Sequence, residues 1–314
     1  MALKLVDLGE FGLIDRIERL ASGLSASDVV LGIGDDAALL RTRPGEDLAL
    51  SSDALVERVH FRLDREDARK VGRRALVAGL SDLAAMGARP LGFTLALAAP
   101  PSRELRVVLG LVRGLLDVAR RERCPLVGGN VTRARELQLT LTVAGAVSRG
   151  RALRRDQGRP GDRIFVTGTL GRPALARLCG RPARPPRPRL EVGRRLARLP
   201  GRGACIDVSD GLLADLAHLC RASGVAARLR AERIPLPRGF AAACRDLGAE
   251  PRQLALCGGE DYELCFTLRP GALDGARLSR RLGAPVREIG FLEPGAGVQV
   301  SPPLPPGSPG WRHF

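Results

Sequence analysis

Aspartates recur at the edges of apolar segments along this chain. The stretch LGIGDDAALL places Asp35 and Asp36 side by side in a glycine-bracketed turn, and the motifs SSD, LSD, IDVSDG and GGED repeat the pattern further on. Adjacent anions repel each other, so they are either solvated on a surface loop or neutralised by a cation. Hard divalent cations bind oxygen ligands drawn from several segments, often in phosphate chemistry. The recurrence therefore favours a magnesium site over a set of ordinary turns.

The stretch ACIDVSDGLLADLAHLC is the most informative part of the second half of the chain. Residues 204–208 predict a strand and residues 211–221 predict an amphipathic helix, so Asp210 occupies the expected helix N-cap, where aspartate is preferred. Capping does not explain Asp207, which lies within the apolar strand. Acids beside a helix N-terminus can hold a cation together with phosphate oxygens.

Three other features are ambiguous when taken alone. His60 is one of three histidines, and its spacing favours a structural side chain. Gly128 and Gly129 end a predicted strand, where they would let a phosphate approach the backbone but would also fit any tight turn. Asp82 lies among apolar helix residues, where a carboxylate is costly unless it is paired or bound to a metal. Structural and functional interpretations of Asp82 are therefore evenly balanced.

Both helices and strands are needed to position these residues. The spacing of apolar residues predicts helices over residues 9–20, 66–88 and 102–123 and strands over 29–33, 48–51 and 136–148. The last strand alternates apolar and polar residues, which is typical of an antiparallel sheet with one buried face. A polar, Arg- and Gly-rich passage follows it. We therefore expect two domains, 1–148 and 149–314.

The composition argues against several classes of protein. A chain of 314 residues that is 45% hydrophobic can bury a sizeable core, and no apolar run is long enough to span a membrane, so we expect a soluble intracellular protein. Seven scattered cysteines without a CxxC pair indicate reduced thiols. The net charge of +16 could indicate nucleic-acid binding, but the arginines are dispersed and aromatic residues make up only 3%. We therefore expect neither a nucleic-acid nor a membrane partner.

Six motifs in this order closely resemble those of the thiamine-monophosphate kinase family, in the superfamily of aminoimidazole ribonucleotide synthetase and selenophosphate synthetase. They are GIGDDAALL, SSDALVERVHF, LSDLAAMGARP, GGNVTR, IDVSDGLLADL and GGEDYELCFT, and they span nearly the whole chain. The resemblance implies a two-domain α+β fold. Its N-terminal domain would bind ATP and metal and would form a barrel from mixed sheets across a homodimer. Its C-terminal α/β sandwich would complete the active site.

The resemblance also implies a reaction. The protein would be a cytoplasmic phosphotransferase that moves the γ-phosphoryl group of ATP onto thiamine monophosphate, with several Mg²⁺ ions. The implied magnesium ligands are Asp36, Ser51, Ser52, Asp53, Asp82, Asn130, Asp207 and Asp210, of which the acids are the catalytic residues. The implied ATP contacts are Gly129, Asn130, Arg155 and Ser209, and the implied contacts to thiamine monophosphate are His60, Glu260 and Trp311.

The chain departs from the family pattern at Asn130. The family's usual GGD is GGN here, so an amide replaces a carboxylate that is expected to bind metal. An amide oxygen can ligate Mg²⁺ without contributing charge, so one metal should bind more weakly. This departure is the one argument for a repurposed or non-catalytic member that binds nucleotide or thiamine phosphate. A sister ATP-dependent enzyme with another small substrate is a further alternative, against which His60, Glu260 and Trp311 weigh.

Overall fold

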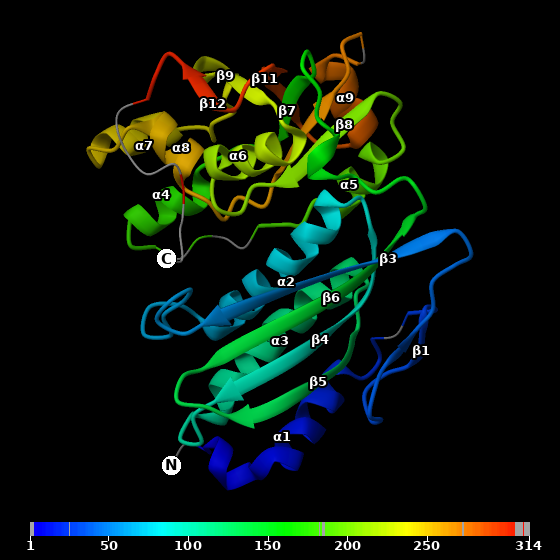
Figure 1. Ribbon diagram of the computed structural model, residues 1–314. Coiled ribbons are helices and arrows are strands. Elements are labelled where there is room, and N and C mark those ends of the chain that lie inside the picture. The colour runs from blue at the N-terminus through cyan, green and yellow to red at the C-terminus, as the bar shows by residue number, and fades with distance from the viewer. Residues whose placement is uncertain are drawn as a thin grey trace. The chain divides into compact units, whose positions relative to one another are not determined.

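The computed structural model describes residues 3–24, 26–181, 183, 186–271, 273–304 and 310. The chain forms two compact units, Met1–Leu83 with Arg89–Arg149 and Ala84–Ala88 with Gly150–Phe314. Each unit combines a β-sheet with packed helices, so the fold is mixed α+β (Figure 1). In the described part of the chain no helix is both long and apolar enough to cross a membrane.

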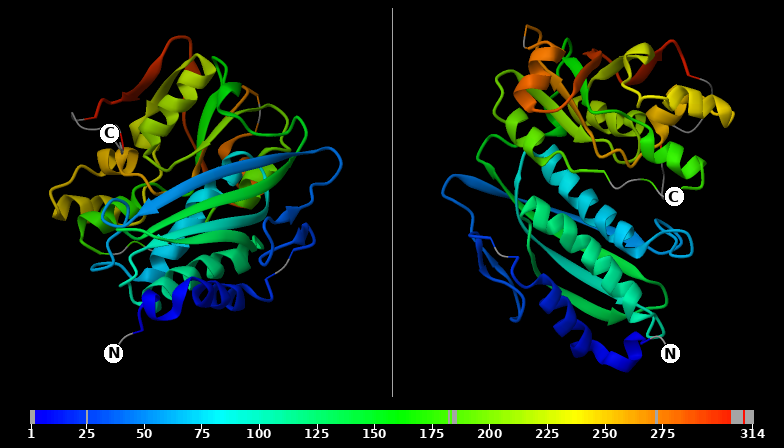
Figure 2. Two further views of the ribbon diagram at one scale, coloured as in Figure 1. Left: turned by 60° about the horizontal axis from the view of Figure 1, so that its bottom comes forward. Right: turned by 180° about the vertical axis from the view of Figure 1, so that it is seen from behind.

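The first unit is built on a four-stranded sheet. Its elements are α1 (Leu5–Ala21), β1 (Val29–Leu31), β2 (Leu39–Leu40), β3 (Glu46–Val56), α2 (Ala68–Ala85), β4 (Arg89–Ala99), α3 (Leu105–Glu122), β5 (Leu126–Arg133) and β6 (Gln138–Ser148). The sheet order is β3-β6-β4-β5, and β1 pairs with β2 separately. Helices α2 and α3 cover one face of the sheet, and no described element of this unit covers the other (Figure 2).

The expected antiparallel strand is confirmed in β6. It pairs antiparallel with β3 and β4, while β4 and β5 are parallel. Its Leu139, Leu141 and Val143 are fully buried beneath the helices, and the intervening threonines are half-buried. Leucine and valine at every second position therefore fix which face of the sheet packs against α2 and α3.

Glycines set how closely α2 and α3 approach each other. A Cβ at Gly72 would lie 2.0 Å from the Leu111 carbonyl oxygen, and one at Gly114 would lie 2.1 Å from the Arg69 carbonyl oxygen. Both distances are far below van der Waals contact. Only glycine at both positions allows the two helix backbones to touch.

Two strands differ from the sequence expectation. β3 is one continuous strand of 11 residues, whereas the expected strand covered only residues 48–51. β5 was expected to end at Gly128, Gly129 and Asn130, but it continues to Arg133. Its pairing with β4 explains the second glycine, because a Cβ at Gly129 would lie 2.1 Å from the Leu95 carbonyl oxygen.

The second unit is built on a six-stranded sheet. Its elements are η1 (Arg155–Gln157), β7 (Arg163–Thr167), α4 (Arg172–Leu178), α5 (Leu190–Leu196), β8 (Arg202–Asp207), α6 (Leu212–Ser223), β9 (Ala226–Arg230), η2 (Ala231–Arg233), α7 (Phe240–Asp246), α8 (Pro251–Cys257), β10 (Leu264–Leu268), α9 (Gly275–Leu282), β11 (Val286–Glu293) and β12 (Gly297–Ser301). The order is β12-β9-β11-β7-β10-β8. All neighbours are antiparallel except β12 and β9.

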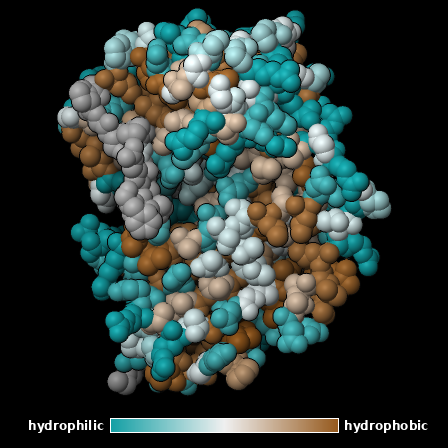
Figure 3. Space-filling model, viewed as in Figure 1, coloured by the Kyte–Doolittle hydropathy of each residue, from teal (hydrophilic) through white to brown (hydrophobic). Residues whose placement is uncertain are grey.

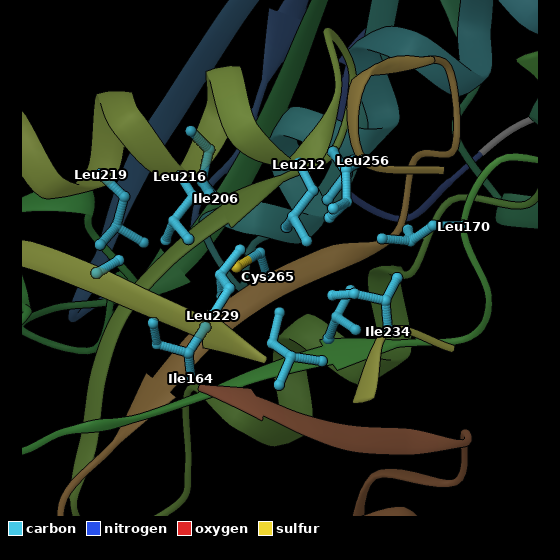
Figure 4. Close-up of a cluster of buried hydrophobic side chains, with 14 of the residues drawn as sticks. Ile164, Leu170, Ile206, Leu212, Leu216, Leu219, Leu229, Ile234, Leu256 and Cys265 are labelled. Atoms are coloured by element: carbon cyan, nitrogen blue, oxygen red, sulfur yellow. The ribbon is translucent and has the colours of Figure 1, made fainter. Parts of the chain in front are cut away.

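Apolar side chains fill the space between this sheet and α6. Leu212, Leu216 and Leu219 of α6 pack with Ile164 and Ile206 of the strands, and every one of them is fully buried (Figure 4). Helices α7 and α8 add side chains to the same cluster. All seven cysteines of the chain are free thiols, and five of them are buried.

The short segment Ala84–Ala88 belongs to the second unit. The Leu153 amide donates to the Met86 carbonyl at 3.1 Å, and a Cβ at Gly193 would lie 2.0 Å from the Ala84 carbonyl oxygen. This segment therefore packs with residues that come after the first unit in the sequence.

Gly129→Ala should destabilise the protein strongly, since its Cβ cannot fit against the β4 backbone. Overpacking of this kind costs roughly 1–3 kcal/mol. Gly128→Ala is the matched control, because its Cβ would meet only the Thr94 methyl at 3.7 Å. Urea unfolding of both variants and the wild type measures the difference. Equal unfolding midpoints for the two variants would contradict a packing role for Gly129.

Candidate functional site

Ser51, Asp53 and Asp82 form a polar cluster within the first unit. Ser51 and Asp53 are two residues apart on β3, so both point to the face that α2 covers. There the Ser51 hydroxyl donates to Asp82 Oδ2 at 2.5 Å. Asp53 Oδ2 is buried and accepts no hydrogen bond from any residue that the structure describes. Burial and, secondly, the charge of Asp82 raise the pKa of Asp53 to about 6.

This cluster has the properties of a cation site. A buried carboxylate oxygen without a donor is costly, and a second carboxylate nearby increases the cost. A bound cation would offset the missing donor and the repulsion between the two carboxylates. All the candidate ligand atoms are oxygens, which Mg²⁺ prefers. Three of the predicted magnesium ligands therefore lie together.

Ser52 and Asn130 lie on the opposite face of the same sheet. The Ser52 hydroxyl is 3.2 Å from the Thr142 hydroxyl, and in the strand register Asn130 is level with Ala96 and Thr140 on that face. Three strand spacings, about 14 Å, separate the edge strands that carry them. Within this unit the sheet therefore stands between these two residues and the pair Asp53 and Asp82.

Asp35 and Asp36 are exposed in the turn between β1 and β2. The Asp36 amide donates to Asp35 Oδ1 at 2.8 Å, so one carboxylate is engaged within the turn itself. Across the described residues, no three His, Cys, Asp or Glu side chains lie close enough together to hold a metal ion. Asp36 is therefore not brought to the cluster of Asp53 and Asp82.

Asp207, Ser209 and Asp210 lie together in the second unit, at the end of β8. The turn that follows is held by Asp215, whose Oδ2 accepts the amides of Ser209, Asp210 and Gly211 at 3.0, 3.1 and 3.1 Å. The expected N-cap at Asp210 is wrong, because Gly211 is the N-cap residue and offers no side chain. An aspartate in the first turn of the helix therefore accepts the amides of the cap residue and of the two residues before it.

Asp215 was missed in the sequence. Burial raises the pKa of Asp215 to about 8, with further contributions from Asp207 and Asp210, while the amide donors act in the opposite direction. The available signal was its place in LLADLAHL, where a carboxylate lies among apolar helix residues. Its amide contacts depend on how the turn folds back over the helix, which spacing does not reveal.

A second turn, residues 258–262, packs beside the first. The Glu260 amide donates to the Ser209 carbonyl at 2.6 Å, and the Tyr262 amide donates to the Val208 carbonyl at 2.8 Å. Glu260 and Tyr262 have φ of 61° and 49°, a left-handed conformation that is uncommon outside glycine. This turn therefore brings Glu260 next to Ser209, and the Glu260 carboxylate is paired with Arg177.

Two more acids in the GGEDYEL motif are buried. Asp261 Oδ1 accepts the Gly171 amide at 2.9 Å, while its Oδ2 is buried and without a hydrogen bond. Burial raises the pKa of Asp261 well above its usual range. Glu263 accepts two hydrogen bonds from Arg189, at 2.6 and 2.5 Å. Both acids fix the turn to neighbouring elements.

The remaining predicted contacts are dispersed. His60 Nδ1 accepts the Val56 amide at 3.0 Å, so the neutral ring carries its proton on Nε2. Arg155 is exposed at the start of η1. Trp311 lies outside the residues that the structure describes.

Comparison with known proteins gives one consistent result. Residues 34–147 match the family of AIR synthase related proteins, N-terminal domain. The chain is 41% identical to thiamine-monophosphate kinase of Escherichia coli K12 over 90% of both chains, and 38% identical to that of Synechococcus elongatus.

Solved structures agree with these relatives. Thiamine-monophosphate kinase from Stenotrophomonas maltophilia K279a superposes with a TM-score of 0.81 at 38% identity, covering 96% of this chain and 98% of that one. AaThiL complexed with AMPPCP and TMP superposes with a TM-score of 0.76 at 31% identity, covering 98% of both.

Asp53→Asn should stabilise the metal-free protein at pH 7.5 by about 1–2 kcal/mol. Since the pKa of Asp53 is about 6 in the folded protein against 3.8 for an unperturbed aspartate, the buried charge destabilises the folded state fully above pH 6 and progressively less as pH falls toward 4. The gain should therefore shrink at pH 4.5. Denaturant unfolding in EDTA at the two pH values measures it.

Asp47→Asn is the control, because it removes the same charge from an exposed position of the same strand. In the described part of the chain Asp47 pairs with Arg149 at 3.5 Å on the surface, where such pairs contribute little. Equal effects of the two substitutions at pH 7.5 would contradict a specific cost at Asp53.

Proposed function

Because the chain belongs to the thiamine-monophosphate kinase family, we propose that it transfers the γ-phosphoryl group of ATP to the phosphate of thiamine monophosphate, releasing thiamine diphosphate and ADP. The observation that carries the proposal is identity of about 40% to curated kinases over 90% of both chains. The structure of AaThiL complexed with AMPPCP and TMP superposes over 98% of both chains.

Magnesium is part of this proposal. Mg²⁺ would supply positive charge between the two anionic phosphates. Ser51, Asp53 and Asp82 would hold it in the first unit, since Asp53 Oδ2 lacks any partner and all donors are oxygen. Asp207 and Asp210 would supply ligands from the second unit, and Asp36, Ser52 and Asn130 complete the proposed set.

The chain's own residues would bind and orient both substrates. We assign Gly129, Asn130, Arg155 and Ser209 to ATP. The backbone of Ser209 makes two hydrogen bonds, since its amide donates to Asp215 and its carbonyl accepts the Glu260 amide. These bonds fix the position of Ser209 in the turn between Asp207 and Asp210.

His60, Glu260 and Trp311 are assigned to thiamine monophosphate. His60 Nδ1 accepts the Val56 amide at 3.0 Å, which fixes the orientation of the ring in this assignment. Glu260 reaches this role only if the substrate competes with Arg177 for its carboxylate.

No covalent nucleophile is required for this reaction. The acceptor phosphate is already ionised at neutral pH, so catalysis would depend on positioning and on neutralising charge. The acids and their supporting turns would supply both. Free buried thiols are consistent with the cytoplasm, where we place the reaction.

The uncovered sheet face supports a homodimer. Leu48 and Leu50 of β3 are 54% and 64% exposed on it, next to small and uncharged side chains (Figure 3). β3 and β5 are also edge strands, which closure with a second copy would pair. We propose that two N-terminal sheets form the expected barrel. A sedimentation mass equal to one chain of 33.4 kDa would contradict it.

The purified protein should form thiamine diphosphate from thiamine monophosphate and ATP, with dependence on Mg²⁺ and without product from free thiamine. Liquid chromatography of the product measures this. Arg155→Gln should raise KM for ATP, and His60→Gln should raise KM for thiamine monophosphate. Nucleotide binding with no product at any Mg²⁺ concentration would instead support a repurposed member of the family, and turnover of another small substrate would support a sister enzyme.

Asn130→Asp should lower the Mg²⁺ concentration for half-maximal activity by about tenfold, because a carboxylate adds roughly 1.4 kcal/mol of attraction over an amide. Thr132→Asp is the control, since it adds the same charge on the same strand face. Identical Mg²⁺ titrations for wild type and Asn130→Asp would show that this position does not contact the metal.

A further inference from the structure

A cavity of about 300 Å³ lies in the second unit, away from the acids described above. It is lined by Asp156, Gln157, Gly158, Arg159, Arg202 and Arg269. Arg202 begins β8, whereas Asp207 ends it, so about 16 Å of strand separates the cavity from the proposed catalytic acids. Arg155, which is assigned to ATP, does not line it.

Positive charge in this cavity exceeds negative charge. The Asp156 carboxylate is engaged by Arg154, and Arg269 is engaged by the buried Asp162. Arg159 and Arg202 form no ion pair within the described structure. The cavity therefore presents two uncompensated guanidinium groups.

Arg202 has unused hydrogen-bonding capacity. One of its terminal nitrogens donates to the Gly150 carbonyl at 3.1 Å, but its Nε is buried and has no hydrogen-bond partner among the described residues. Burial and the neighbouring Arg151 lower the pKa of Arg202, which is the direction expected where cations are crowded without an anion. An anionic acceptor at this point would accept a hydrogen bond from Arg202 Nε and would also reduce the repulsion between Arg202 and Arg151.

The geometry points to a ligand that carries phosphate. Guanidinium groups recognise phosphate oxygens through charge-assisted, often bidentate, hydrogen bonds. A volume of about 300 Å³ is at the lower end for small-molecule sites. We propose that the cavity binds a diphosphate group, either as free pyrophosphate or as the diphosphate of a nucleotide, through Arg159 and Arg202. This inference is independent of the proposed kinase activity.

Calorimetric titration of the full chain with pyrophosphate, in EDTA and about 0.1 M salt, tests the proposal. EDTA suppresses binding at the proposed catalytic acids, which would need Mg²⁺ to hold phosphate. Arg159→Gln and Arg202→Gln should each weaken binding at least tenfold. Arg281→Gln, which removes an exposed arginine of α9, should leave it unchanged. A parallel titration with ADP distinguishes a nucleotide from the free anion.

Arg159 is exposed and its side chain makes no described hydrogen bond, so its substitution should leave the unfolding temperature unchanged. That variant keeps the test decisive if Arg202→Gln folds poorly. Absence of pyrophosphate binding by the wild type below about 1 mM would overturn the proposal, as would equal affinities of the wild type and Arg159→Gln. Loss of binding in Asp210→Asn but not in Arg159→Gln would place the anion at the catalytic acids instead.

Discussion

The cost of holding carboxylates close together away from water governs how both units are built. In the first unit, β3 directs Asp53 beneath α2, where Asp82 approaches it and one oxygen of Asp53 finds no donor. Hydrophobic packing holds this arrangement in place, because β6 and α2 bury leucines and valines on the same side of the sheet. The favourable free energy of packing therefore offsets part of the cost of holding the two carboxylates close together.

In the second unit, backbone amides offset the cost of holding carboxylates close together. Three amide groups converge on Asp215 and offset part of the cost of burying it beside Asp207 and Asp210. Those three amides come from the cap residue and the two residues before it, so they hold the turn that leads into the helix.

Much of the fold followed from the sequence, because periodicity reports burial directly. The alternation in residues 136–148 correctly predicted β6 as a strand of an antiparallel sheet, and helical spacing located α2 and α3 to within a few residues. The expected end of β3 at residue 51 was wrong because polar residues there face a partly buried site. Asp215 was missed for a related reason, since its donors come from a turn whose path depends on the packing of residues 258–262.

The sequence identified the candidate residues more readily than it showed which of them lie on the same face of the sheet. Motifs singled out Ser51, Asp53 and Asp82, but strand alternation separates Ser52 from its two neighbours and places it on the other face with Asn130. A sequence motif is contiguous, whereas a strand distributes its residues over two faces. A dimer closed through the uncovered faces would bring Ser52 and Asn130 of both copies to its interface, whereas Asp53 and Asp82 would stay beneath α2 in each copy. Dimer formation would therefore act on one half of the proposed ligand set of this unit and leave the other half as the single sheet places it.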